Sequence, residues 1–146
     1  MVFGQDRKQI RSVFCRAWHK QEQGQTLEPL EHIIVTVIEA HPEYQVLLAD
    51  PDALLEDYSP ERGETNPFLH MGMHIALHEQ LAIDRPVGIV SVYRELGRRL
   101  NDSHEIEHRM LSCLAETLWE AQRNRTLPDE QLYLQRLRRL VKKTSN

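Results

Sequence analysis

Apolar residues recur at intervals of three and four along most of this chain, which is the spacing of one face of an α-helix. The expected main helices cover residues 10–18, 26–40, 66–84, 86–100, 101–124 and 128–143, with a short helix over 43–49. Their starts are expected at Thr26, at Asn66 with Pro67, at Pro86, at Asn101 or Asp102, and at Thr126 with Pro128. No run has the alternation of a half-buried strand, and no glycine-rich phosphate loop is present. We therefore expect an all-α fold, a single-domain bundle of five to six helices over residues 1–146.

The composition excludes several classes of protein. Of 146 residues, 40% are hydrophobic, which is enough for a core, and no stretch approaches the roughly 18 uncharged apolar residues of a membrane span. The first eleven residues carry frequent charges and no apolar segment, unlike a secretory signal. The two cysteines form neither a disulfide framework nor a metal-knuckle spacing. We expect a soluble, cytoplasmic protein that does not bind membranes.

Charge is unevenly spread along the chain. The net charge is -4, residues 50–66 form an acidic connection, and the expected helix 128–143 is basic. That helix carries five cations: Arg136, Arg138, Arg139, Lys142 and Lys143. A basic helix can contact nucleic acid or an acidic partner, but few aromatic residues flank this one, so a solvated face is favoured over nucleic-acid binding. The sequence identifies no partner and is compatible with a homo-oligomer.

The histidines are the most informative polar residues. The chain has eight, and a helical projection turns five of them toward the core. These are His41, His70, His74, His104 and His108. His78 lies at the margin of the apolar stripe and His32 faces outward. If the main helices alternate in direction, all five inward histidines collect at one end of the bundle, where residues 50–66 could form a lid.

Such a cluster predicts a transition-metal site. Side chains at i and i+4 are neighbours on a helix, so each of two histidine pairs can take adjacent positions on one ion. Imidazole suits zinc, iron, copper and nickel, and zinc or iron is the expected metal. A carboxylate ligand is also expected, because the positive helix ends that point at the site oppose a cation. The predicted metal ligands are therefore His41, His70, His74, His104, Glu107 and His108. Catalytic residues and a reaction are left unassigned.

Three alternatives remain open. Inward histidines also occur in hydrogen-bonded polar cores without any metal. The chain could be a metal-free interaction module that uses the bundle surface or the basic C-terminal helix. Residues 104–108 read His-Glu-Ile-Glu-His, which matches the zinc-peptidase motif with Glu105 as the group that activates water. That reading is disfavoured, because such peptidases hold substrate along an edge strand and no strand is expected.

Cys15 and Cys113 have no activating partner at local spacing, so a thiol nucleophile is not expected.

Several short motifs resemble those of a known family. They are His41-Pro42-Glu43-Tyr44, Asn66-Pro67-Phe68-Leu69-His70 with His74 and Glu79-Gln80, Glu107-His108-Arg109-Met110, Cys113-Leu114-Ala115-Glu116, and Leu118-Trp119 with Ala121-Gln122. Together they resemble domain-of-unknown-function family 1841, a family of short bacterial proteins, over nearly the whole chain. The resemblance implies that the histidine-bearing segments are the family's hallmark, and it implies no activity. Two residues depart from the family pattern: His78 stands where arginine is expected, and Glu105 is outside the pattern.

Overall fold

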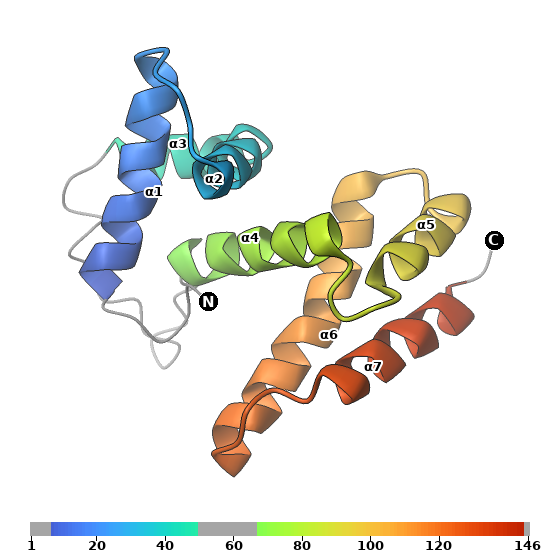
Figure 1. Ribbon diagram of the computed structural model, residues 1–146. Coiled ribbons are helices and arrows are strands. Elements are labelled where there is room, and N and C mark those ends of the chain that lie inside the picture. Colours follow the sequence, from blue (N-terminus) through green and yellow to red (C-terminus); the bar gives the residue numbers. More distant parts are fainter. Residues whose placement is uncertain (1–6, 50–66, 145–146) are drawn as a thin grey trace. The chain divides into compact units, whose positions relative to one another are not determined.

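The computed structural model describes residues 7–49 and 67–144, with side chains from residue 11 onward. Its described residues form seven helices and no strand (Figure 1). The helices are α1 (Arg7–Glu22), α2 (Pro29–Glu39), α3 (Pro42–Leu48), α4 (Pro67–Ile83), α5 (Ile89–Arg99), α6 (Ser103–Asn124) and α7 (Glu130–Lys143). The all-α expectation is confirmed, and the helix count is one above the expected range. No helix in the described ranges is both long enough and apolar enough to cross a bilayer.

The seventh helix is α3, which matches the short helix expected over 43–49 beside the main helices. Pro42 forces the preceding residue, His41, out of the helical region, with φ −132° and ψ 84°, so α2 and α3 are separate elements. The acidic connection 50–66, the lid suggested for it and the expected cap Asn66 lie outside the described residues.

The chain divides into two compact units, the N-terminal unit Met1–Ala76 and the C-terminal unit Leu77–Asn146. The boundary falls inside α4. The expectation of one domain over residues 1–146 stays a prediction.

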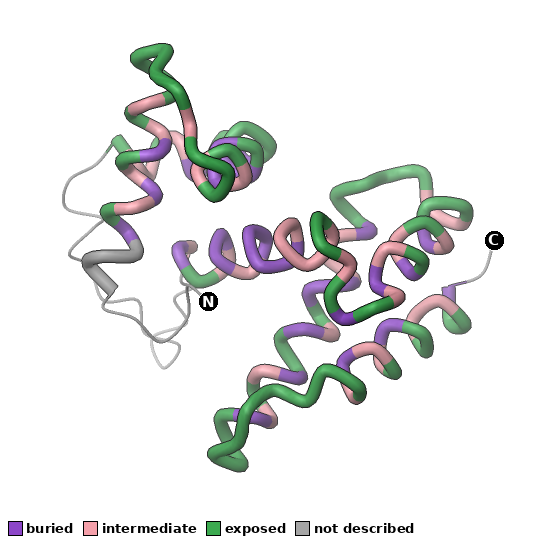
Figure 2. Tube along the Cα trace, in the orientation of Figure 1, coloured by how far each residue is buried: buried purple, intermediate pink, exposed green. Residues whose placement is uncertain are grey.

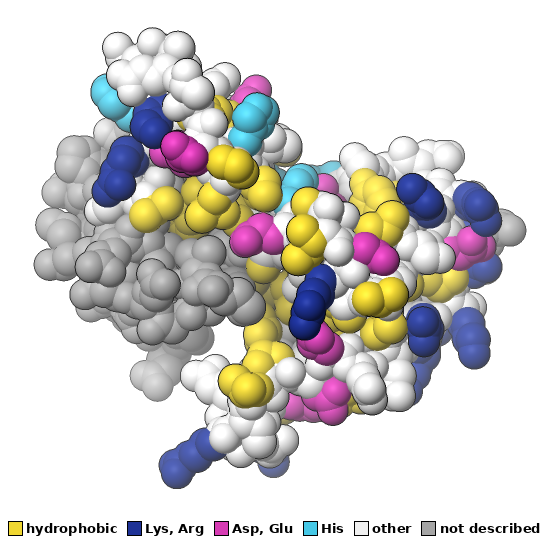
Figure 3. Space-filling view, in the orientation of Figure 1, with side chains coloured by type: hydrophobic (Ala, Val, Ile, Leu, Met, Phe, Trp, Pro, Cys, Tyr) yellow, Lys and Arg dark blue, Asp and Glu magenta, His cyan; other side chains and the backbone are white. Residues whose placement is uncertain are grey.

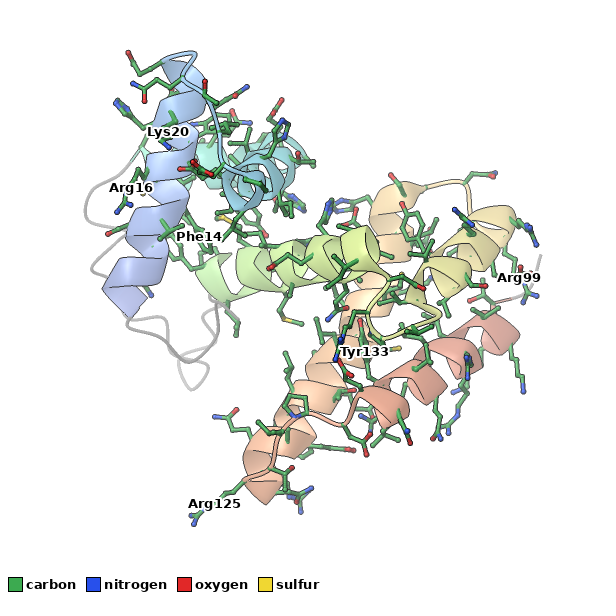
Figure 4. All side chains as sticks on the ribbon, in the orientation of Figure 1. Phe14, Arg16, Lys20, Arg99, Arg125 and Tyr133 are labelled. Carbon is green, nitrogen blue, oxygen red and sulfur yellow. The ribbon has the colours of Figure 1, made fainter. Side chains whose placement is uncertain are left out.

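In the N-terminal unit, α1 packs against α2. Figure 2 shows buried positions recurring along α1 and α2, as expected for amphipathic helices that share a core. Phe14 of α1 stacks on Phe68 of α4 with ring centroids 6.5 Å apart, and Lys20 pairs with Glu31 of α2 at 2.9 Å (Figure 4). The core consists of Phe14, Ala17, Ile34, Val35, Val37, Ile38, Tyr44, Phe68, Met71 and Ile75.

The start of α2 differs from the expectation. The helix begins at Pro29, with Glu28 as its N-cap, and not at Thr26. The backbone N–H of Glu28 donates to the Glu31 carboxylate at 2.8 Å. Pro29 suits the first helical position, because it has no N–H group and the N–H at that position would have no partner within the helix. This local hydrogen bonding places the helix start later than expected.

In the C-terminal unit, α7 packs against both α5 and α6. The Tyr133 hydroxyl of α7 donates to the side-chain oxygen of Gln80 in α4 at 2.8 Å (Figure 4). Gly88, just before α5, lies beside Leu134, and Arg99 at the end of α5 donates to the backbone oxygen of Thr144 at 3.0 Å. Therefore α5 and α7 run in the same direction, and their C-terminal ends lie together.

Aspartates mark three helix starts in this unit. Asp102 caps α6 as expected, accepting from the His104 N–H at 3.0 Å, and Asp129 caps α7 by accepting from the Leu132 N–H at 3.1 Å. The expected starts of the other two helices at Pro86 and Pro128 are wrong: α5 begins at Ile89 and α7 at Glu130. Before α5, the Asp84 carboxylate accepts from the N–H groups of Gly88 and Val90, which holds a turn where helix was expected.

Candidate metal centre

His41 is positioned by the break between α2 and α3. Its ring is buried, and its Nδ1 lies 2.8 Å from the carbonyl oxygen of Val37. A carbonyl only accepts, so Nδ1 carries the proton and donates to it, and in the neutral ring Nε2 then carries the lone pair. This is the way in which metal-binding histidines are commonly oriented, with the far nitrogen held by a backbone carbonyl.

His70 and His74 lie one turn apart on α4. Their Nε2 atoms are 3.1 Å apart, and their ring centroids are separated by 4.7 Å. His74 is fully buried and His70 half-buried. Two nitrogen ligands on tetrahedral zinc, each about 2.0–2.1 Å from the ion, are themselves about 3.3 Å apart. The pair therefore already has the spacing of two ligands on one ion.

The three rings converge within the N-terminal unit. The His41 centroid lies 4.5 Å from that of His74 and 6.4 Å from that of His70. Each of the three residues offers a ring nitrogen, and these nitrogens lie within 4.8 Å of one another. Imidazoles that are distant in sequence meet here because Pro42 ends α2 and the hydrogen bond to Val37 fixes the ring of His41.

Tyr44 completes the aromatic surroundings of this cluster. Its ring stacks on His41 with centroids 4.7 Å apart, and its centroid is 6.4 Å from that of His70. Burial is the main cause that raises the pKa of its hydroxyl, and the charge of Glu43 adds to the shift. Tyr44 is therefore neutral at physiological pH. Sequence reasoning placed Tyr44 in a family motif but not at the site, although its position three residues after His41 puts it one helical turn away.

The second histidine pair belongs to the C-terminal unit. His104 and His108 of α6 have ring centroids 4.1 Å apart. His108 is half-buried, but His104 is exposed, so its expected inward orientation is wrong. The reason is its place at the second residue of α6, where Asp102 caps the helix and solvent covers the first turn. Their role as ligands stays a prediction.

Glu107, the expected carboxylate ligand, lies against His78. The His78 Nε2 is 2.9 Å from a carboxylate oxygen of Glu107, and both side chains are half-buried. The negative charge of Glu107 also adds to the effect of burial in raising the pKa of Tyr93. The helical projection placed His78 at the margin of the apolar stripe, so the sequence did not predict this contact. Its spacing of four from His74 places both side chains on one side of α4, and this was the signal that His78 could contact a neighbouring helix.

The peptidase motif has the wrong geometry. The Glu105 carboxylate is exposed and pairs with Arg109 at 2.7 Å, one turn along the same helix. A glutamate that activates a metal-bound water must face the metal rather than an arginine on its solvent side. The described residues also contain no strand on which a peptide could be held.

The surroundings of Cys15 and Cys113 do not favour a reactive thiol. Burial raises the pKa of the Cys15 thiol, and burial is also the largest cause of the raised pKa of Cys113. A raised pKa lowers the thiolate fraction at neutral pH, and the thiolate is the reactive form.

The comparison with family models identifies the chain. A model described as a domain of unknown function, DUF1841, matches residues 6–139. The chain belongs to the DUF1841 family. The match includes the five predicted histidine ligands and Glu107, so every candidate ligand lies in the part of the chain that the family shares. Neither the curated proteins nor the solved structures gave a match.

Proposed function

We propose that this DUF1841 protein binds a transition metal ion, zinc or iron, through His41, His70 and His74. The observation that carries the proposal is the meeting of three imidazoles from two separate elements, with nitrogens within 4.8 Å of one another and two of them 3.1 Å apart. Neutral imidazole is a ligand that both metals accept. The hydrogen bond from His41 to Val37 supports the same assignment.

The ligand count determines what the ion can do. Three protein ligands leave a coordination position for water, which permits hydrolytic or redox chemistry. A fourth or fifth protein ligand closes the site and makes its role structural or a matter of storage. His104, Glu107 and His108 are the predicted additional ligands, and their variants decide between these two roles.

Elemental analysis of the full chain, purified without a histidine tag, tests the proposal. Wild type is expected to hold one equivalent of metal, and His70→Gln and His74→Gln are expected to lose it. His32→Gln and His19→Gln are matched controls, because both histidines are exposed and lie on α2 and α1 of the same unit. Both controls should keep the metal.

Thermal unfolding of the same variants separates loss of a ligand from loss of the fold. If metal binds the folded state, a chelator should lower the melting temperature of wild type but not that of His70→Gln. The proposed site would be refuted if wild type contains no metal and if added zinc or iron(II) leaves its melting temperature unchanged. A metal-free interaction module would then be the better description.

A further inference from the structure

A second feature of this chain is a surface on which cations collect. We define the basic surface by six residues: Arg94 and Arg98 of α5, and Arg138, Arg139, Lys142 and Lys143 of α7. All six are exposed. Figure 3 shows Lys and Arg side chains gathered over α5 and α7. The sequence analysis considered only the cations of the last helix and favoured a solvated face. The structure shows that α5, which also carries exposed arginines, packs beside that helix.

The basic face of α7 contains no acidic residue. At about 100° per residue, its four cations and two exposed glutamines, Gln131 and Gln135, fall within an arc of about 140°. Arg138 with Lys142 and Arg139 with Lys143 are like charges one turn apart, a spacing that destabilises a helix. A face that only needed to be solvated would gain stability from interspersed glutamates.

Neighbouring carboxylates are paired with arginines of the same unit, and one of these arginines, Arg98, belongs to the basic surface. Arg136 pairs with Glu120 at 2.6 Å and lies 3.6 Å from Glu116. Glu95 pairs with Arg98 at 2.9 Å and with Arg99 at 3.5 Å. Within residues 7–49 and 67–144, the four cations on the outer face of α7 take part in no ion pair.

Helix dipoles explain only part of this charge. The C-terminal ends of α5 and α7 lie together, as the hydrogen bond from Arg99 to Thr144 shows, and each end carries about half a negative elementary charge. Cations near those ends are therefore favourable. However, two helix ends and Glu95 amount to about two negative charges, against the six cations of the basic surface.

The kind of side chain indicates the kind of partner. The exposed large hydrophobic residues of the C-terminal unit are Ile83, Val87, Trp119 and Leu127, and none lies on α5 or α7. Protein interfaces are commonly anchored by tryptophan, tyrosine and arginine in well-packed pockets, and this surface offers arginine without any exposed large apolar or aromatic side chain. A helix that lies in a membrane surface inserts its apolar face, but Tyr133 and Leu137 of α7 are buried in the unit.

We propose that the basic surface binds the phosphate backbone of double-stranded nucleic acid without preference for base sequence. Arginine, lysine and glutamine side chains are common donors to phosphate oxygens. No aromatic residue is present on this surface to stack on unpaired bases, which favours a duplex over a single strand. The proposal does not depend on metal binding.

Fluorescence anisotropy with the full chain and a mixed-sequence DNA duplex of about 20 base pairs tests this proposal. The variant is Arg139→Gln/Lys143→Gln, and the matched control is Arg123→Gln/Arg125→Gln, which removes two exposed cations elsewhere in the same unit. Binding of wild type should weaken steeply between about 50 and 200 mM salt. Each lost contact should weaken binding about eightfold near 0.1 M salt, and the variant should lower the logarithmic salt slope by about two. The control variant should bind the duplex with the affinity of wild type. Wild type should also bind a duplex of scrambled sequence with the same affinity.

Three results would overturn the proposal. They are equal weakening by the two double variants, affinity that does not change with salt, and tighter binding to polyglutamate, single-stranded DNA or anionic vesicles than to the duplex. All four substituted positions are exposed, so the variants should fold, and far-UV circular dichroism verifies this.

Discussion

Two histidine pairs with the same spacing have different surroundings in this protein. His70 and His74 are held on α4 with Nε2 atoms 3.1 Å apart, and buried His41 packs against His74. His104 and His108 lie on α6 with ring centroids 4.1 Å apart, but His104 is exposed in the first helical turn. His74 of the first pair is fully buried, whereas the second pair begins at the second residue of its helix.

The contrast teaches that i, i+4 spacing brings two imidazoles together but does not enclose them. Enclosure comes from other elements: the break at Pro42 places His41 over the first pair, whereas Asp102 caps the turn that carries His104. A ring that packing holds in place loses less freedom when it binds an ion than an exposed ring does. We therefore expect the first pair to contribute more to metal affinity.

The largest expected effects are on the stability of the two units. Phe14→Ala should cost about 3–5 kcal/mol and Leu137→Ala about 2–5 kcal/mol, because both side chains are fully buried and each change leaves a cavity. Urea unfolding should be followed by circular dichroism and by the fluorescence of the two tryptophans, Trp18 in one unit and Trp119 in the other. If the chain is one cooperative domain, either substitution shifts both tryptophan signals together. A shift confined to the substituted unit would show that the single-domain prediction is wrong.

Next in size is the difference between the histidine pairs. His74→Gln should weaken metal binding by more than the 10–100-fold typical of an outer-sphere partner, since it removes a direct ligand. His104→Gln should weaken it by less than about tenfold, because the ring is exposed in the first turn of α6. Competition with a chromophoric chelator measures both affinities. Equal losses would instead place both pairs on the metal, as the sequence predicts.

A smaller effect is expected from the cap of α6. Asp102→Ala removes the acceptor for the His104 N–H and should cost about 1 kcal/mol of stability. Amide hydrogen exchange should increase in the first turn of α6 and stay unchanged at His70 and His74. Asp129→Ala is a control of the same chemistry, because it removes the cap of α7 instead. Increased exchange around His74 in the Asp102 variant would contradict the expectation that this cap stabilises only its own helix.

The smallest effect concerns the two thiols. Burial raises the pKa of both, and the negative charge of Glu116 adds to the shift at Cys113. Glu116→Gln should lower the pKa of Cys113 and so increase its thiolate fraction and its alkylation rate at pH 8, by about twofold. The rate at Cys15 should stay unchanged and serves as the internal reference. Slower alkylation of Cys113 in this variant would contradict the expectation that the charge of Glu116 raises the pKa of the thiol.

Much of the helical pattern follows from local sequence. Pro67 as the first residue of α4, Asp102 as a cap and Asn124 as the last residue of α6 were all expected, because capping and hydrophobic periodicity act over a few residues. The starts of α2 and α5 were missed, because the hydrogen bonds that set them involve Glu31 and Asp84, whose acceptor roles depend on a folded turn.

The candidate site shows the same division. Spacing along one helix sufficed to pair His70 with His74 and His104 with His108, since helix geometry is periodic and local. Only the packed structure could show that His41 joins the first pair, that Glu107 meets His78, and that His104 faces solvent. Those outcomes depend on contacts between elements far apart in the chain, and a helical period carries no information about which neighbour will cover a given turn.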